Sequence, residues 1–247
     1  KNRISIIFVS LIILYYICAS IRIHPHYLSY FNELAGGPEE GYKYLVDSNI
    51  DWGQDLKGLE DYVENENVSD VILSYYGACI PEAVRFKFQD LYSFGIWGEK
   101  KHINSLHPDK EILAVSVTNL QGLYLGRIGN DVLKWLLDKN PTKKIGYSIF
   151  LYDITHNAEF HERLAHIYFY TFQFDKAIRE AQRAIIINPE SAFAHLILSF
   201  VYLINNQRME ALKEYRLALK FNPELKFHYD ELITNAYSRR IYADSFN

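Results

Sequence analysis

A spacing of 34 residues recurs through the last third of this 247-residue chain. The same offset superposes residues of like kind: Pro189 on Pro223, His161 on His195, Leu164 on Leu198, Tyr168 on Tyr202, Ala177 on Ala211 and Ala184 on Ala218. A unit of this length holds two antiparallel helices, with small residues where the helices approach and a proline that ends each unit. We therefore expect an all-α region at 155–247 built from helical hairpins.

This pattern resembles the tetratricopeptide repeat. The resemblance implies two repeats, at 158–191 and 192–225, and a protein partner as their ligand. Two such units cannot bury their apolar faces alone, so a capping helix is expected after Pro223, with Leu232 at the next equivalent position.

An uncharged apolar run, Ile4–Ile21, lies near the amino end. As a helix it spans about 27 Å, close to the thickness of a bilayer's hydrocarbon core. We expect one transmembrane helix at 1–22, with a signal peptide as the alternative. Lys1 and Arg3 before the run favour a cytoplasmic amino end and an extracytoplasmic remainder. Because the sequence begins with Lys rather than Met, it is expected to be a piece of a longer protein.

The region 23–154 alternates strand-like and helix-like patterns. Strands are expected at "YKYLVD", "DVILSYYG", "EILAVSVT" and "IGYSIFLYDI", and helices at "WGQDLKGLEDYVENE" and "NDVLKWLLDKN". The stretch from Pro81 to Pro108 is interpreted as a helix followed by a long loop. This alternation predicts an α/β domain with a mostly parallel sheet.

The stretch "DSNIDWGQD" places Asp47, Asn49, Asp51 and Asp55 at positions 1, 3, 5 and 9 of a calcium loop. Position 12, where a bidentate Glu is needed, is Gly58, and position 6, where Gly is needed, is Trp52. No metal site is therefore expected here. Histidines at 156, 161 and 166 cannot converge on one ion from a helix, so no histidine metal site is expected either.

Two interpretations of this stretch stay open. In the first, Asp51 is the N-cap of the following helix and Asp55 lies in its first turn. In the second, Asp47, Asn49, Asp51, Trp52, Gln54 and Asp55 form a ligand-binding cluster at the end of a strand, where α/β sheets bind ligands.

A second polar patch, "SVTNLQG", also follows a strand and contains Asn119 and Gln121. By the same strand-end rule it should lie on the same sheet edge as Asp47–Asp55. The two patches together would suit a sugar or a glycolipid headgroup, although loop capping explains the same residues. The sequence shows no nucleophile elbow and no glycine-rich phosphate loop, so no cofactor and no catalytic residue is assigned.

Charge argues against one class of partner. The 26 basic and 30 acidic residues give a formal net charge of −4, and no basic block occurs. Nucleic acid is therefore not expected to bind.

The segments "PHYLSYFNELAGGPEEGYKYLVDSNIDWGQDL", "SVTNLQGLYL" and "IGYSIFLYDI" resemble the carboxyl-terminal part of prokaryotic membrane glycosyltransferases of the GT-C fold, similar to the protein O-mannosyltransferase and aminoarabinose-transferase superfamily. The resemblance covers about residues 20–154. It implies a longer, multi-pass parent protein that transfers sugar from a polyprenyl-phosphate carrier, with the catalytic acid in an upstream membrane region that this chain lacks. The chain would then be inactive alone, with the bilayer and a lipid-linked sugar donor as partners. The alternative is a membrane-anchored, non-catalytic interaction protein.

Overall fold

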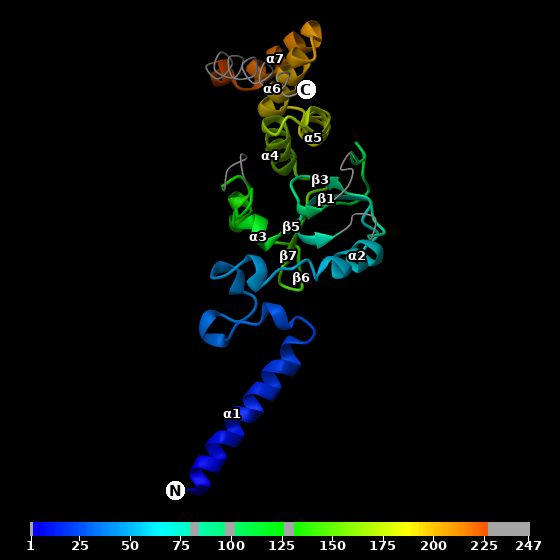
Figure 1. Cartoon of the computed structure of the whole chain (residues 1–247). Coiled ribbons are helices and arrows are strands. Elements are labelled where there is room, and N and C mark those ends of the chain that lie inside the picture. The colour runs from blue at the N-terminus through cyan, green and yellow to red at the C-terminus, as the bar shows by residue number, and fades with distance from the viewer. Residues whose placement is uncertain (1, 80–83, 97–101, 126–130, 227–247) are drawn as a thin grey trace.

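The computed structural model describes residues 2–79, 84–96, 102–125 and 131–226 (Figure 1). The α-helices in this part are α1 (Asn2–Ile23), α2 (Leu56–Asn65), α3 (Val117–Leu120), α4 (Ala158–Tyr170), α5 (Phe174–Ile187), α6 (Ala192–Ile204) and α7 (Arg208–Phe221). The strands are β1 (Asp70–Ser74), β2 (Tyr76–Cys79), β3 (Gln89–Asp90), β4 (Phe94–Ile96), β5 (Glu111–Ser116), β6 (Lys143–Ile145) and β7 (Ile149–Asp153). Short 3-10 turns are η1 (Tyr27–Ser29), η2 (Glu33–Ala35), η3 (Gly41–Lys43), η4 (Asp47–Asn49), η7 (Lys134–Asp138) and η8 (Pro223–Leu225).

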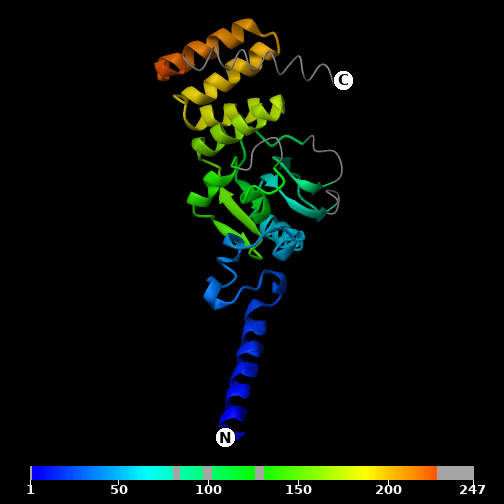
Figure 2. The same cartoon turned by 60° about the vertical axis from the view of Figure 1, so that its left-hand side comes forward.

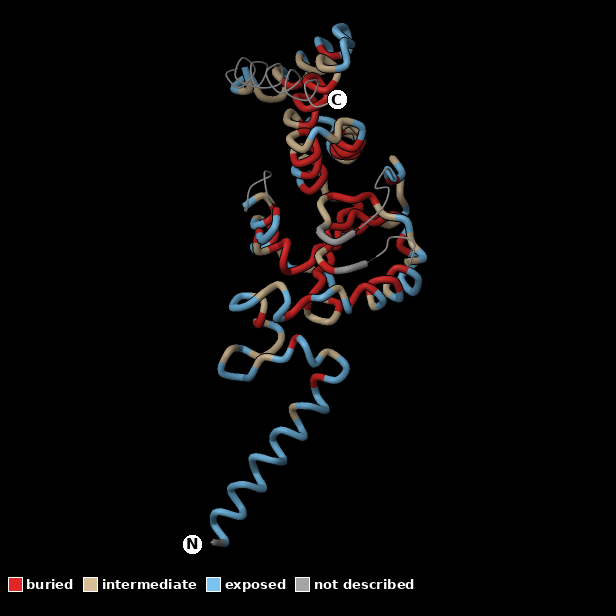
Figure 3. Tube along the Cα trace, viewed as in Figure 1, coloured by how far each residue is buried: buried red, intermediate tan, exposed pale blue. Residues whose placement is uncertain are grey.

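Helix α1 projects from one end of the molecule, and the helices α4–α7 stack at the other end (Figures 1 and 2). The segment Arg3–Ile23 is long and apolar enough to cross a membrane, and its side chains are almost all exposed (Figure 3). An apolar helix without protein packing needs another apolar environment, which a bilayer provides.

The central five-stranded sheet has the strand order β3-β1-β5-β7-β6. Strand β1 pairs in parallel with β3 and β5, but β7 runs antiparallel to both β5 and β6. The prediction of a mostly parallel sheet is therefore wrong, because the sheet is mixed. The cause is a turn inside "IGYSIFLYDI", where Gly146 and Tyr147 both have positive φ and fold the segment into a hairpin.

Three other local predictions also fail. The expected strand "YKYLVD" overlaps the turn η3 and ends at Asp47, the first residue of η4, and Tyr44 and Leu45 in it are exposed. The segment "NDVLKWLLDKN" forms only the 3-10 turn η7 within its described residues. Between Pro81 and Pro108 the described residues contain strands β3 and β4 rather than a helix.

Side chains on the two faces of the sheet enter two separate cores, as the two-residue period of a strand requires. On one face Val71, Leu73 and Leu151 pack against α2, through Leu56, Leu59 and Val63. On the opposite face the buried cluster includes Ile72, Leu113, Val115, Phe150 and Tyr152 and continues into helices α4–α6. The cluster therefore crosses the predicted boundary at 154/155, and the repeats share their core with the sheet.

The two hairpins repeat with the expected period. Helices α4 and α6 begin 34 residues apart, as do α5 and α7. Phe172 and Asn206, which have positive φ in the turns inside the hairpins, differ by the same offset. The expected capping helix after Pro223 and its Leu232 lie mostly in residues 227–247, outside the described part of the chain.

Candidate functional site

The segment 47–55 runs along one edge of the sheet and there contacts the second polar patch, "SVTNLQG". The amide N–H of Asp47 donates to Thr118 Oγ1 at 3.0 Å, at the carboxyl end of β5. At the other end of the segment, Ser148 Oγ, just before β7, donates to Asp55 Oδ2 at 2.6 Å. The segment thus passes the ends of neighbouring strands, although the residues before Asp47 are not themselves a strand.

Asp47 is held by two tyrosines. Its Oδ1 accepts a hydrogen bond from the hydroxyl of Tyr76, and its Oδ2 accepts one from the hydroxyl of Tyr124 at 2.7 Å. The two rings stack with centroids 5.5 Å apart. These hydrogen bonds, first that of Tyr76 and then that of Tyr124, lower the pKa of Asp47 below its ordinary value. Asp47 is therefore an ionised carboxylate beside an aromatic pair.

Asp51 is fully buried, in contrast to Asp47. Its Oδ1 accepts from the Gly53 N–H at 2.9 Å, whereas its Oδ2 lacks a geometric hydrogen-bond partner among the described residues. Burial raises the pKa of Asp51 to about 7, despite the opposing effect of the Gly53 hydrogen bond. The interpretation of Asp51 as a helix N-cap is wrong, because α2 begins at Leu56 and Asp55 occupies the N-cap position.

Asp55 and Asn119 are also buried on this edge. The Asp55 carboxylate accepts a hydrogen bond from the Ser148 hydroxyl and lies 3.2 Å from His26 Nδ1. The Asn119 amide donates to Ser74 Oγ at 3.0 Å and to the Tyr92 carbonyl at 3.2 Å, which ties α3 to the ends of β1 and β3. Its Oδ1 has no partner in the described part of the molecule.

The four remaining candidates mainly support the backbone around them. Asn49 donates to the Val46 carbonyl at 3.3 Å, Gln54 to the Ile50 carbonyl at 3.0 Å, and Gln121 to the Tyr42 carbonyl at 3.1 Å. The Trp52 indole N–H donates to the Ser48 carbonyl at 2.8 Å, yet the side chain stays 63 % exposed. An exposed indole fixed at its polar end leaves an apolar face available to a ligand.

Tyr76, Tyr124 and His26 belong to this polar edge, but the sequence reasoning did not single them out. Tyr76 follows the end of β1, and that position could have indicated it, because the carboxyl ends of β1 and β5 meet at one edge. His26 and Tyr124 come from distant segments, and the sequence pattern contains no indication of their proximity. Among the described residues no group of three or more His, Cys, Asp or Glu side chains could hold a metal ion.

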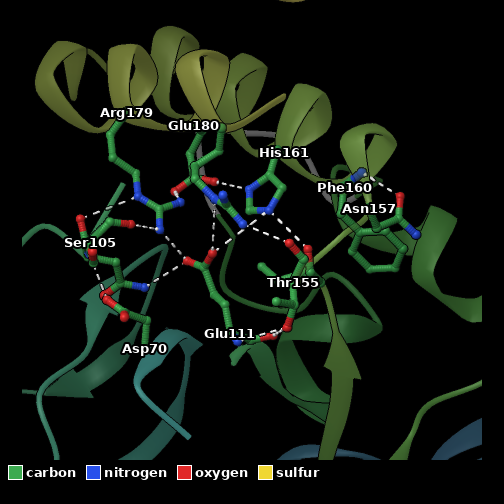
Figure 4. Close-up of polar contacts among 12 residues, drawn as sticks. Asp70, Ser105, Glu111, Thr155, Asn157, Phe160, His161, Arg179 and Glu180 are labelled. Atoms are coloured by element: carbon green, nitrogen blue, oxygen red, sulfur yellow. Dashed lines mark hydrogen bonds and ion pairs between the residues drawn. The ribbon is translucent and has the colours of Figure 1, made fainter. Parts of the chain in front are cut away.

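A second polar cluster is buried where the repeats meet the sheet (Figure 4). Arg179 of α5 donates to Glu111 of β5 at 2.6 Å and to Glu180 at 2.8 Å. His161 Nδ1 lies 2.7 Å from Glu180 Oε2, and its Nε2 lies 3.0 Å from the Ile154 carbonyl. The carboxylates of Glu111 and Glu180, the guanidinium of Arg179 and the imidazole of His161 are all buried. Their contacts with one another therefore replace the hydrogen bonds that water would otherwise make. This cluster joins the two regions rather than opening a site.

A family model for the tetratricopeptide repeat matches residues 158–191, which are helices α4 and α5 with their flanks. No curated protein matches the chain. No solved structure matches it.

Proposed function

We propose that this chain is a membrane-anchored recognition module, in which α1 is the anchor and the tetratricopeptide hairpins bind a protein partner. The observation that carries the proposal is that the anchor helix and the partner-binding hairpins are separated in the molecule. Helix α1 and the hairpins lie at opposite ends of the molecule (Figure 2). The shared core and the Glu111–Arg179 ion pair fix the hairpins on the sheet, so a bound partner is held away from the anchor.

Helix α7 supports a specific location for the partner. Only Ala211 and Ala218 of this helix are buried, whereas Met209 and Leu212 are exposed. Three exposed basic residues, Lys213, Arg216 and Lys220, lie on the same stripe at helical spacing. A partner segment that combines apolar and acidic side chains would match this surface.

Site-specific photo-crosslinking of the full chain in cells tests this proposal. A photoreactive amino acid in place of Leu212 should form a crosslink to a partner protein. The same photoreactive amino acid in place of Lys57, which is exposed on α2, should not crosslink to that protein. Arg216→Glu should abolish that crosslink, because it places like charge opposite an acidic segment. Identical crosslinks from both positions, or a crosslink from Leu212 only to residues 227–247 of the same chain, would contradict the proposal.

A second, finer function is supported by the resemblance of residues 20–154 to membrane glycosyltransferases. We propose that the module is the extracytoplasmic carboxyl-terminal region of such an enzyme, whose sugar comes from a polyprenyl-phosphate carrier. The polar edge favours this proposal, because the Asp47 carboxylate, the stacked Tyr76 and Tyr124 rings and the exposed Trp52 face are groups that bind saccharides. In this role the edge handles the acceptor and does not perform the chemical step.

Transfer assays with a radiolabelled polyprenyl-phosphate sugar test the finer function. We expect no transfer by the 247-residue chain alone, and transfer by the longer parent polypeptide in membranes. In that parent, Asp47→Asn with Trp52→Ala should raise KM for the acceptor and leave kcat nearly unchanged. Transfer by the isolated chain, or an equal fall in kcat and kcat/KM, would show that the edge takes part in the chemistry.

A further inference from the structure

A cavity lies where the membrane helix meets the α/β domain. It has a volume of about 320 Å³, and its lining includes Arg22, Ile23, Tyr30, Glu33, Glu39 and Tyr147. Because Arg22 and Ile23 are the last residues of α1, an anchored chain places the Arg22 side of this cavity at the level of the lipid headgroups.

The segment after α1 folds back beside the helix. The Tyr15 hydroxyl donates to Glu33 Oε2, although Tyr15 lies eight residues before the end of α1, about 12 Å along its axis. Leu34, next to Glu33, is 98 % exposed. An exposed leucine beside an apolar helix indicates that this segment enters the membrane interface together with the end of the helix.

Arg22 and Glu33 act on each other through space, but no hydrogen bond or ion pair joins them among the described residues. Arg22 makes no hydrogen bond or ion pair within the described residues, whereas Glu39 is paired with Lys144 at 2.8 Å. The Glu33 carboxylate accepts hydrogen bonds from the neutral Tyr15 hydroxyl and from its own backbone N–H, and these, more than the charge of Arg22, lower the pKa of Glu33. Among the described residues, the cavity thus offers one cation without a hydrogen-bond partner and one carboxylate without a paired cation.

We propose that this cavity binds the headgroup of an amine-bearing phospholipid, with the phosphate on Arg22 and the ammonium on Glu33. A guanidinium binds phosphate oxygens through parallel hydrogen bonds, and a carboxylate accepts from a primary ammonium. The aromatic rings of Tyr30 and Tyr147 in the lining suit the same interface. The inference rests on the proposed membrane anchoring of α1.

The test is lipid retention by the full chain, reconstituted in nanodiscs of mixed phosphatidylethanolamine, phosphatidylcholine and phosphatidylglycerol and measured by native mass spectrometry. We expect phosphatidylethanolamine to be retained in preference to both other lipids. Arg22→Gln and Glu33→Gln should each reduce that retention about tenfold, the loss that corresponds to one charge-assisted hydrogen bond. The matched control, Arg3→Gln at the other end of α1, should leave it unchanged.

Equal retention of phosphatidylethanolamine and phosphatidylcholine, or preference for phosphatidylglycerol, would overturn the inference. Retention that survives Arg22→Gln would also overturn it, as would equal binding of soluble O-phosphoethanolamine in place of the lipid. Alkaline extraction of the chain from vesicles of the same lipid composition separates this result from the proposed anchoring. A chain that is extracted refutes the anchor itself, whereas a chain that stays without lipid preference refutes only the headgroup site.

Discussion

His161 Nδ1 lies 2.7 Å from Glu180 Oε2, and the same pair recurs 34 residues later as His195 and Glu214, at 2.6 Å. In each hairpin the second imidazole nitrogen approaches a carbonyl just before the first helix, that of Ile154 or of Pro189. The imidazole therefore links the two helices of its hairpin to the preceding segment. The 34-residue repeat of the sequence therefore also appears in the polar contacts of the two hairpins.

The two histidines should differ in their contribution to stability. His161→Ala is expected to lower the free energy of unfolding by about 3 kcal/mol, because it leaves the fully buried Glu180 without one of its partners. His195→Ala should lower it by only about 1 kcal/mol, because the Glu214 side chain is 13 % exposed and water can replace the imidazole. Chemical denaturation of the full chain in detergent measures both, and equal losses would show that burial of the carboxylate does not set the cost.

The repeat period could be predicted from the sequence because it is local and recurs. Helices α4–α7 follow it without a shift, and His161 has the structural role that its repeat position implied. The contact of these helices with Glu111 could not be predicted. Glu111 lies on β5, and the sequence carries no indication of which strand faces α4 and α5. Contacts between distant segments depend on how the two layers pack.

The direction of the last strands was predicted wrongly for a local reason. "IGYSIFLYDI" has a strand-like composition throughout, yet Gly146 and Tyr147 reverse the chain after β6. A single glycine followed by tyrosine is a weaker turn pattern than Asn-Gly or Asp-Gly. For the candidate site, Asp47 does meet Thr118 as expected, but the strand-end rule does not explain it, because the residues before Asp47 are not a strand. The burial of Asp51 depends on neighbours that the sequence does not identify.

The buried charge cluster leads to a second prediction. Arg179→Ala should lower the free energy of unfolding by about 3 to 5 kcal/mol, because Glu180 would remain buried without its arginine and Glu111 would keep only the more distant Arg183, at 3.7 Å. Arg163→Ala is the matched control, since Arg163 pairs with Glu159 on the surface of α4 and should cost less than about 1 kcal/mol. Urea unfolding of the two variants in detergent measures the difference. Similar losses would mean that the cluster does not hold the repeats on the sheet.

Asp51 should make stability depend on pH. Its pKa is about 7 in the folded chain against an ordinary value of 3.8, so the folded state binds the proton more tightly than the unfolded state. Its contribution is fully present below about pH 4 and is lost as the pH rises through about 7. Between about pH 5 and pH 8 this group should lower the free energy of unfolding by about 2 to 3 kcal/mol, and Asp51→Asn should remove that fall.

Asp47→Asn is the control of opposite sign. The folded-state pKa of Asp47 is lowered, first by the Tyr76 hydroxyl, so its contribution is present above its ordinary pKa and is lost only as the pH falls below it. This variant should therefore be destabilised by the same amount at both ends of the pH range. A pH-dependent fall that persists in Asp51→Asn would show that another group causes it.

Gly53 should tolerate no side chain, because the loop that carries Asp51 packs directly on the strand that follows β1. Gly53 has a φ of +83°, and an added Cβ would lie 1.8 Å from the Tyr75 hydroxyl and 3.3 Å from the Gly77 Cα. Gly37 has a similar φ of +71°, but a Cβ there would meet nothing within 4 Å.

Gly37→Ala should therefore cost only the backbone strain of about 1 kcal/mol, whereas Gly53→Ala should cost at least about 2 kcal/mol more and displace Tyr75. Denaturation of both variants gives the difference, which separates steric contact from backbone strain because the two glycines have similar positive φ. If the two losses are equal, the loop does not pack on Tyr75, and the buried position of Asp51 that depends on this packing is also wrong.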